Sequence, residues 1–131
     1  MQPEEINKGK PAWKILVVDD DTDVTKIMKL LLEQEGHTVQ TANSGKEALA
    51  LLEDARFDLV TTDFSMAGMK GSTLAARIKE GLPKQPVLMI STNGAVAKAA
   101  GDPLPGVDMV MSKPFYIEDL RKAIARLLPV V

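Results

Sequence analysis

Short apolar runs alternate with amphipathic segments along most of this chain. Runs of aliphatic and β-branched residues bounded by polar residues predict five strands, at 14–18, 38–42, 57–63, 86–91 and 107–111. The first run, KILVV, and the fourth, PVLMIS, lack the apolar–polar alternation of a half-exposed strand. Such continuous runs are typical of strands that are buried on both faces of a parallel sheet.

The segment after the first strand has the spacing of an amphipathic helix. Its apolar residues stand at positions i, i+3, i+4 and i+7: Val24, Ile27, Met28 and Leu31. We expect these side chains to be buried and Gly36 to end the helix. The only histidine, at position 37, follows this glycine and is expected to be an exposed turn residue.

Three further segments have helical signals. A capping box of Ser44 and Glu47 predicts the start of the second helix, and 71–80 predicts the third. The last helix has an apolar stripe, formed by Ile117, Leu120, Ile124 and Leu127. The segment 94–106 also contains breakers, Gly101, Pro103 and Pro105. Any helix in 94–106 is therefore expected to be short or irregular.

The alternation of strands and helices predicts the fold class. It indicates an α/β domain with a five-stranded parallel sheet and helices on both faces, because right-handed crossovers place helices there. We expect residues 14–129 to form this single domain, residues 1–13 to be a flexible lead-in, and no output domain to follow.

Composition and charge narrow the function classes. The 131 residues include 16 basic and 18 acidic side chains, and the net charge of −2 gives no electrostatic basis for direct binding to nucleic acid. The absence of cysteine excludes disulfides and thiolate metal sites. No apolar run approaches the length of about 20 residues that a membrane-spanning helix needs. We therefore expect a cytoplasmic protein without membrane insertion.

Polar residues of distinctive chemistry stand at the ends of four predicted strands. They are Asp19, Asp20 and Asp21 after the first, Asp63 after the third, Ser91 and Thr92 after the fourth, and Lys113 and Pro114 after the fifth. Because ligands of open parallel sheets bind at the carboxyl ends of the strands, we expect these residues at one edge. Asp21 is expected to cap the following helix.

This edge would hold the groups that phosphoryl transfer needs. Asp19 or Asp20 together with Asp63 would offer carboxylate oxygens to Mg²⁺, which prefers such ligands. A carboxylate can also act as a nucleophile and become an aspartyl phosphate. The transferred group carries negative charge, which Mg²⁺, the Lys113 ammonium and the Ser91 hydroxyl would stabilise.

Four motifs in order carry a resemblance to a known family: ILVVDD, DLVTTDFSMAGMKG, PVLMIST and MSKPF. From about Lys14 to Leu128, the chain resembles the receiver domain of two-component response regulators. The resemblance implies the flavodoxin-like receiver fold, with the strand order 2-1-3-4-5, and a phosphoacceptor signalling domain that is not an enzyme. It implies a sensor histidine kinase or phosphotransfer protein as donor, Mg²⁺ or Mn²⁺ as cofactor, an unknown downstream protein target, and a monomer or weak dimer.

The resemblance also implies roles for single residues. Asp63 would be the phosphoacceptor and, with Asp20, a direct metal ligand. Asp19 would be the other member of the acidic pair, and Ser65 would offer its backbone carbonyl to the metal.

Further roles concern the other two strand ends. Ser91 would be the switch hydroxyl. Lys113 would pair with the phosphate and precede a cis peptide bond to Pro114. Ser65 and Asn93 would flank the attacking water and tune the lifetime of the phosphoryl group.

Several residues depart from the usual receiver pattern. Ala67 replaces a proline in the loop after the acceptor, so this loop is expected to be less rigid. Thr92 replaces a small residue and would narrow access to the phosphate. Val110 replaces the aromatic residue that turns inward on activation. Tyr116 replaces a capping residue, so the last helix is expected to start less cleanly.

Three alternative functions remain open at this point. A degenerate receiver could act as a phosphorylation-independent, constitutive interaction module, which Ala67 and Val110 favour. An aspartyl phosphohydrolase would have a D-x-D motif, whereas Asp63-Phe64-Ser65 lacks the second aspartate. A flavodoxin-like cofactor binder would have a Ser/Thr/Gly-rich loop after strand one, where DDDTD would repel phosphate.

Overall fold

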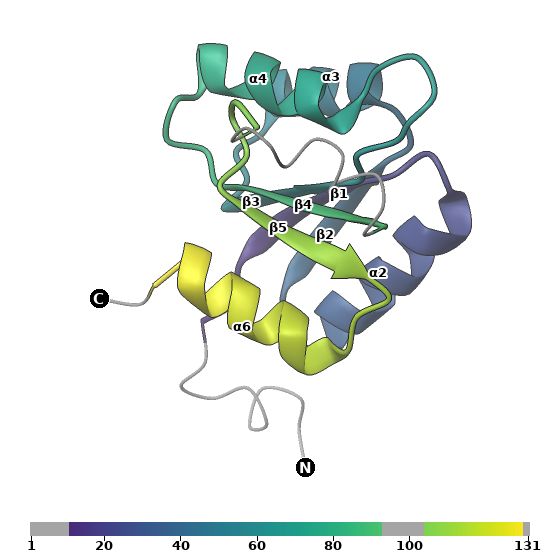
Figure 1. The fold of residues 1–131 in the computed structure, drawn as a ribbon. Coiled ribbons are helices and arrows are strands. Elements are labelled where there is room, and N and C mark those ends of the chain that lie inside the picture. The colour runs from purple at the N-terminus through teal and green to yellow at the C-terminus, as the bar shows by residue number, and fades with distance from the viewer. Residues whose placement is uncertain (1–10, 93–103, 130–131) are drawn as a thin grey trace.

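A computed structural model, shown in Figure 1, describes residues 11–92 and 104–129. Its centre is a five-stranded parallel sheet in the order β2-β1-β3-β4-β5. The strands are β1 (Lys14–Val18), β2 (Thr38–Ala42), β3 (Leu59–Thr62), β4 (Val87–Thr92) and β5 (Met109–Lys113). The predicted fold class and strand order are confirmed.

Helices cover both faces of this sheet (Figure 1). On one face lie α2 (Thr22–Gln34) and α6 (Ile117–Leu127), and on the other lie α3 (Gly45–Asp54) and α4 (Gly71–Gly81). No helix in the described part of the chain is both long and apolar enough to cross a membrane.

The central strand β1 contributes side chains to both layers of the core. Ile15 and Val17 pack in the cluster beneath α2 and α6, whereas Leu16 and Val18 pack in the cluster beneath α3 and α4. All four are almost completely buried. This two-sided burial explains why the KILVV run lacks polar alternation.

The buried face of α2 differs from the predicted one. Thr25, Met28 and Leu32 are buried, whereas Ile27 is 59% exposed, so the predicted burial of Ile27 is wrong. Thr25 can occupy the inner face because its hydroxyl donates a hydrogen bond to the Thr22 carbonyl at 3.0 Å. A hydrophobic pattern alone does not identify a buried threonine whose hydroxyl has a local acceptor.

The fifth strand begins two residues later than predicted, at Met109. Asp108 lies just before the strand. Its carboxylate accepts hydrogen bonds from the N–H of Val87 at 2.8 Å and from the ammonium of Lys79 at 2.7 Å. The predicted irregular helix over 94–106 falls mainly outside the described residues. Within it, Gly106 has a φ of 82° and ends a turn before β5.

The last helix starts cleanly although Tyr116 lacks a suitable side chain. The tyrosine side chain is exposed, but its backbone N–H donates to the Asp119 carboxylate at 2.9 Å. Asp119 thus binds the N-cap backbone from the first turn, as an acidic residue at this position of a capping box does. The expectation of a less clean start is wrong.

His37 connects the starts of β1 and β2. Its Nδ1 accepts a hydrogen bond from the N–H of Trp13 at 3.0 Å, and the Thr38 N–H donates to the Trp13 carbonyl at 2.9 Å. His37 is half-buried, so its predicted full exposure is wrong. Burial lowers the pKa of His37, and the adjacent Glu35 carboxylate, which pairs with Arg121, opposes this shift.

The His37 contact predicts a loss of stability in mild acid. Since burial lowers the pKa of His37 in the folded protein below the usual value of 6.5, the unfolded chain binds the proton first as pH falls. The contribution of neutral His37 to the free energy of unfolding is therefore complete above pH 6.5 and decreases as the pH drops through the lower pKa of the folded protein. Urea unfolding at about pH 7.5 and about pH 5.5 should show this decrease in the wild type and a smaller one in His37→Asn. Parallel profiles of the two proteins would contradict the prediction.

Gly71 lets the first turn of α4 approach the segment after β3. A Cβ at this position would lie 1.9 Å from the backbone oxygen of Asp63, whereas a Cβ at Gly81 would meet nothing within 4 Å. The Gly71 N–H also donates to the Phe64 carbonyl at 2.8 Å. This close approach holds the chain after Asp63 against the helix.

Gly71→Ala should lower the free energy of unfolding by about 2 kcal/mol or more, because the backbone must move to relieve the collision. Gly81→Ala, in the same helix, should be neutral or stabilising by up to about 1 kcal/mol. Chemical denaturation of both variants measures the difference. Equal stability of the two variants would be inconsistent with the steric constraint.

Candidate functional site

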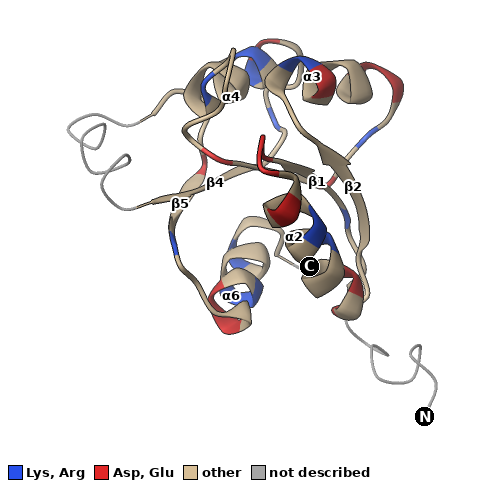
Figure 2. Cartoon of the chain, turned by 90° about the vertical axis from the view of Figure 1, so that its right-hand side faces the viewer, with Lys and Arg blue, Asp and Glu red and all other residues tan. Residues whose placement is uncertain are grey.

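The carboxyl ends of β1, β3 and β5 bring the predicted polar residues to one edge of the sheet. Asp19 follows β1, Asp63 follows β3, and Lys113 is the last residue of β5. Val18 and Thr62 are paired in register, so the two aspartates that follow them leave the sheet side by side. Figure 2 shows acidic residues gathered where β1 leads into α2.

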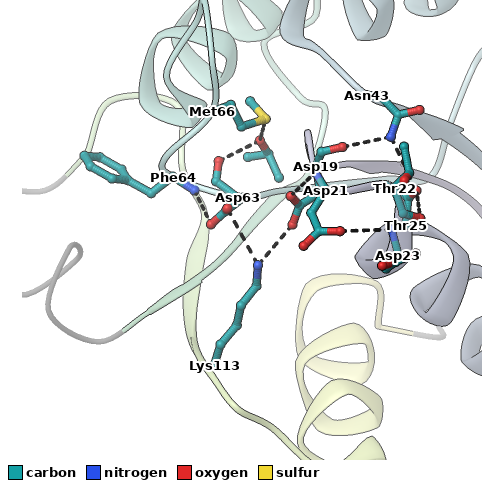
Figure 3. A network of polar contacts seen from close by, with 11 residues as sticks. Asp19, Asp21, Thr22, Asp23, Thr25, Asn43, Asp63, Phe64, Met66 and Lys113 are labelled. Carbon is teal, nitrogen blue, oxygen red and sulfur yellow. Dashed lines mark hydrogen bonds and ion pairs between the residues drawn. The ribbon is translucent and has the colours of Figure 1, made fainter.

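Lys113 is the cation of this site. Its Nζ lies 3.0 Å from Oδ2 of Asp19 and 3.7 Å from Oδ2 of Asp63, as Figure 3 shows. The Asp19 side chain is only 5% exposed. A buried carboxylate needs a partner to remain charged, and Lys113 provides one from 94 residues away in the sequence.

Three carboxylates converge beside this lysine. One oxygen each of Asp19, Asp20 and Asp63 lies within 4.8 Å of the others. One ammonium compensates one of these three charges, which leaves an excess of negative charge that a divalent cation would neutralise. Hard carboxylate oxygens are the ligands that Mg²⁺ and Mn²⁺ prefer. The residues present therefore fit the predicted cation.

Backbone N–H groups orient each of the carboxylates. The N–H of Asp21 donates to Oδ1 of Asp19 at 3.0 Å, and the N–H of Phe64 donates to Oδ1 of Asp63 at 2.8 Å. The N–H of Ala67 donates to Oδ2 of Asp20 at 3.0 Å. Asp21 itself caps α2 as predicted, because its carboxylate accepts the N–H of Asp23.

Asn43 belongs to this site although the sequence analysis missed it. Its Nδ2 donates to the Asp19 carbonyl at 3.1 Å and lies 3.5 Å from Oγ1 of Thr25. The amide thus links the segment after β1 to α2 and to the end of β2. Its place directly after the second predicted strand, at the same edge of the sheet, is the signal that could have identified it.

The remaining predicted site residues occupy varied surroundings. Ser91 is buried in β4 opposite Ser112, and Thr92 is exposed opposite Lys113. Val110 of β5 is 40% exposed. Ser65 is exposed and lies two residues after Asp63, whereas Asn93 lies outside the described residues. The Lys113–Pro114 peptide bond is cis, as predicted. The individual roles of these residues stay predictions.

Comparison with known proteins gives consistent family relationships. The family profile "Response regulator receiver domain" matches residues 15–125. The chain is 37% identical over 115 residues to the transcriptional regulatory protein GlrR of Escherichia coli, covering 88% of this chain and 26% of GlrR. It is 33% identical to the response regulator receiver protein CpdR of Brucella abortus, covering 88% of this chain and 96% of CpdR. The chain thus spans about a quarter of GlrR and nearly all of CpdR.

Solved structures give the same result. The response regulator TrrA of Thermotoga maritima, in complex with Mg²⁺-BeF, has a TM-score of 0.79 at 28% identity and covers 88% of this chain and 98% of TrrA. The sequence motifs, the strand order and the acidic edge agree with this relationship. This chain therefore belongs to the response regulator receiver domain family of two-component signalling systems.

Proposed function

We propose that this chain is cytoplasmic and that its Asp63 accepts a phosphoryl group, in the presence of Mg²⁺ or Mn²⁺, from a sensor histidine kinase or phosphotransfer protein. The observation that carries this proposal is the convergence of Asp63, two further carboxylates and Lys113 at the carboxyl edge of the sheet. The Mg²⁺-BeF complex of TrrA, a similar protein, supports it. The phosphorylated domain then acts through a protein target.

In this proposal, Asp63 acts as the nucleophile. The Phe64 N–H binds its Oδ1, while its Oδ2 faces the Lys113 ammonium. A bond forms between an Asp63 oxygen and the phosphorus, and the bond from phosphorus to the donor nitrogen breaks, with its electron pair going to that nitrogen. The charge on the phosphoryl oxygens must be compensated throughout.

Asp19, Asp20 and Asp63 would hold the cation, which supplies positive charge to the phosphoryl oxygens when bound. Ser65 would add its backbone carbonyl. Lys113 lies nearer to Asp19 than to Asp63 in this structure, and a phosphoryl group on Asp63 would offer it a second anionic partner. Ser91 would supply a hydroxyl from the neighbouring strand β4.

A constitutive interaction module is the second candidate function. Val110 is 40% exposed on β5 and lacks the aromatic ring that usually responds to phosphorylation in receivers. The similar proteins do not point to one type of target. GlrR is a transcriptional regulatory protein, whereas CpdR is a response regulator receiver protein. A phosphorylation assay separates the two candidate functions.

The first test is phosphorylation by a small phosphodonor. Incubation with acetyl phosphate and Mg²⁺ should add one phosphoryl group to the wild type, measured as intact mass, because the proposed nucleophile and the proposed metal ligands all belong to this chain. Asp63→Asn should gain none, and removal of Mg²⁺ with a chelator should abolish the gain in the wild type. Asp58→Asn, which changes the aspartate at the opposite end of β3, serves as the matched control and should be labelled normally.

Stoichiometric labelling of Asp63→Asn would refute Asp63 as the acceptor. Failure to label the wild type, under conditions that label a control receiver, would favour the constitutive interaction module.

The second test concerns the role of Lys113. Lys113→Ala leaves the buried Asp19 without its nearest cation, so the metal-free variant should lose about 1–3 kcal/mol of stability. Mg²⁺ should restore more stability to this variant than it adds to the wild type, because the cation then compensates an additional uncompensated charge. Thermal unfolding with and without Mg²⁺ measures both effects.

Lys79→Ala is the matched control for this measurement. Lys79 pairs with Asp108 at 2.7 Å, and Asp108 directly precedes β5, at the opposite end of this strand from Lys113. Its stability should not depend on Mg²⁺ more than that of the wild type. An equal Mg²⁺ response in the Lys113 and Lys79 variants would argue against the assigned charge balance.

A further inference from the structure

The loop between β3 and α4 contacts the acidic cluster through one backbone group. The N–H of Ala67 donates to Oδ2 of Asp20 at 3.0 Å, across 47 residues of sequence. Both residues are exposed. An exposed aspartate without such a contact samples several side-chain rotamers in water, so the hydrogen bond selects one orientation.

The loop presents this N–H from a fixed position. The residue before Ala67, Met66, is 8% exposed and packs in the cluster beneath α3 and α4. The residue after it, Gly68, has a φ of 82°, a conformation that glycine adopts without strain. The loop is closed by the hydrogen bond from the Gly71 N–H to the Phe64 carbonyl. Ala67 thus directly follows a buried side chain and lies in a loop that a backbone hydrogen bond closes.

The chemistry of a carboxylate allows this contact to coexist with a cation. A carboxylate has two oxygens and about four lone-pair sites. When Oδ2 accepts the N–H of Ala67, the other oxygen of Asp20 remains available as a ligand. One oxygen of Asp20 lies within 4.8 Å of the oxygens of Asp19 and Asp63.

We propose that the Ala67 N–H is a positioning group for Asp20, which holds this exposed carboxylate toward Asp19 and Asp63 and so strengthens binding of the divalent cation. The proposal rests on the proposed function, in which Asp20 is a metal ligand. It also assigns a consequence to the departure from the usual receiver sequence at position 67. Proline has no backbone N–H and could not make this contact.

The coupling is reciprocal. If the Ala67–Asp20 contact favours the cation, then the bound cation must favour the contact to the same extent. Mg²⁺ should therefore slow hydrogen exchange at the Ala67 amide in the wild type. This readout depends on the contact itself and not on phosphorylation.

The test compares two substitutions at the same position. Ala67→Pro removes the donor, and Ala67→Gly keeps it while making the loop more flexible. Titration calorimetry with MgCl₂ should show about tenfold weaker binding for Ala67→Pro, the change expected from losing one hydrogen bond to a charged acceptor, and a change below about twofold for Ala67→Gly. Thermal unfolding without Mg²⁺ verifies that both variants are folded at the titration temperature.

Binding of Mg²⁺ to Ala67→Pro within about twofold of the wild type would overturn the proposal. Weaker binding by the glycine variant than by the proline variant would also overturn it, because loop rigidity and not the N–H would then control affinity. If the wild type binds no Mg²⁺ at all, the metal-dependent proposed function fails, and this outcome differs from a failure confined to the Ala67 variants.

A second measurement does not need the proline variant to fold. Amide hydrogen exchange followed by NMR should be about tenfold faster at Ala67 in Asp20→Ala than in the wild type, because the acceptor is lost. Asp23→Ala, which removes a nearby charge in the first turn of α2, is the matched control and should leave the Ala67 amide unchanged. Equal exchange rates of the Ala67 amide in the wild type and in Asp20→Ala would overturn the proposal, because Asp20 would then not protect this amide.

Discussion

The electrostatic constraint at the carboxyl edge of the sheet determines what the rest of the structure must do. Three carboxylates lie together, and the most buried of them, Asp19, is 3.0 Å from the Lys113 ammonium. These two residues are separated by 94 positions in the sequence. Because all pairings in the sheet are parallel, the carboxyl ends of β1, β3 and β5 lie at the same edge. The fold is therefore a condition for keeping these charges in one place.

Backbone hydrogen bonds orient the three carboxylates of the cluster. One oxygen each of Asp19, Asp20 and Asp63 accepts an N–H of a nearby segment. Because each carboxylate has a second oxygen, this arrangement fixes the side chains without using all of their acceptor capacity. The same geometry thus explains both how the carboxylates are oriented and why the site suits a hard divalent cation.

The sequence predicted those features that depend on residue type and order. The apolar runs gave the five strands, and the polar residues after them gave Asp63 and Lys113 as neighbours. It did not predict contacts that depend on local geometry. The buried face of α2 differs from the predicted one because the hydroxyl of Thr25 has an acceptor within its own helix. The backbone N–H of Tyr116 is likewise bound by Asp119, from the following turn. The N–H of Ala67 carries no signature in the sequence, because every residue except proline has one.

The edge strand β5 carries both Val110, which departs from the usual receiver sequence, and Lys113, which matches it. Its residues alternate, with Lys113 turned toward the acidic cluster and Val110 exposed. Lys113 interacts with two carboxylates, and this requirement restricts its residue type. Val110 meets no comparable requirement within the described structure, so its side chain can change without disturbing the charge balance. Alternation with period two therefore separates a residue that contacts the acidic cluster from one that is exposed to solvent, although one short strand carries both.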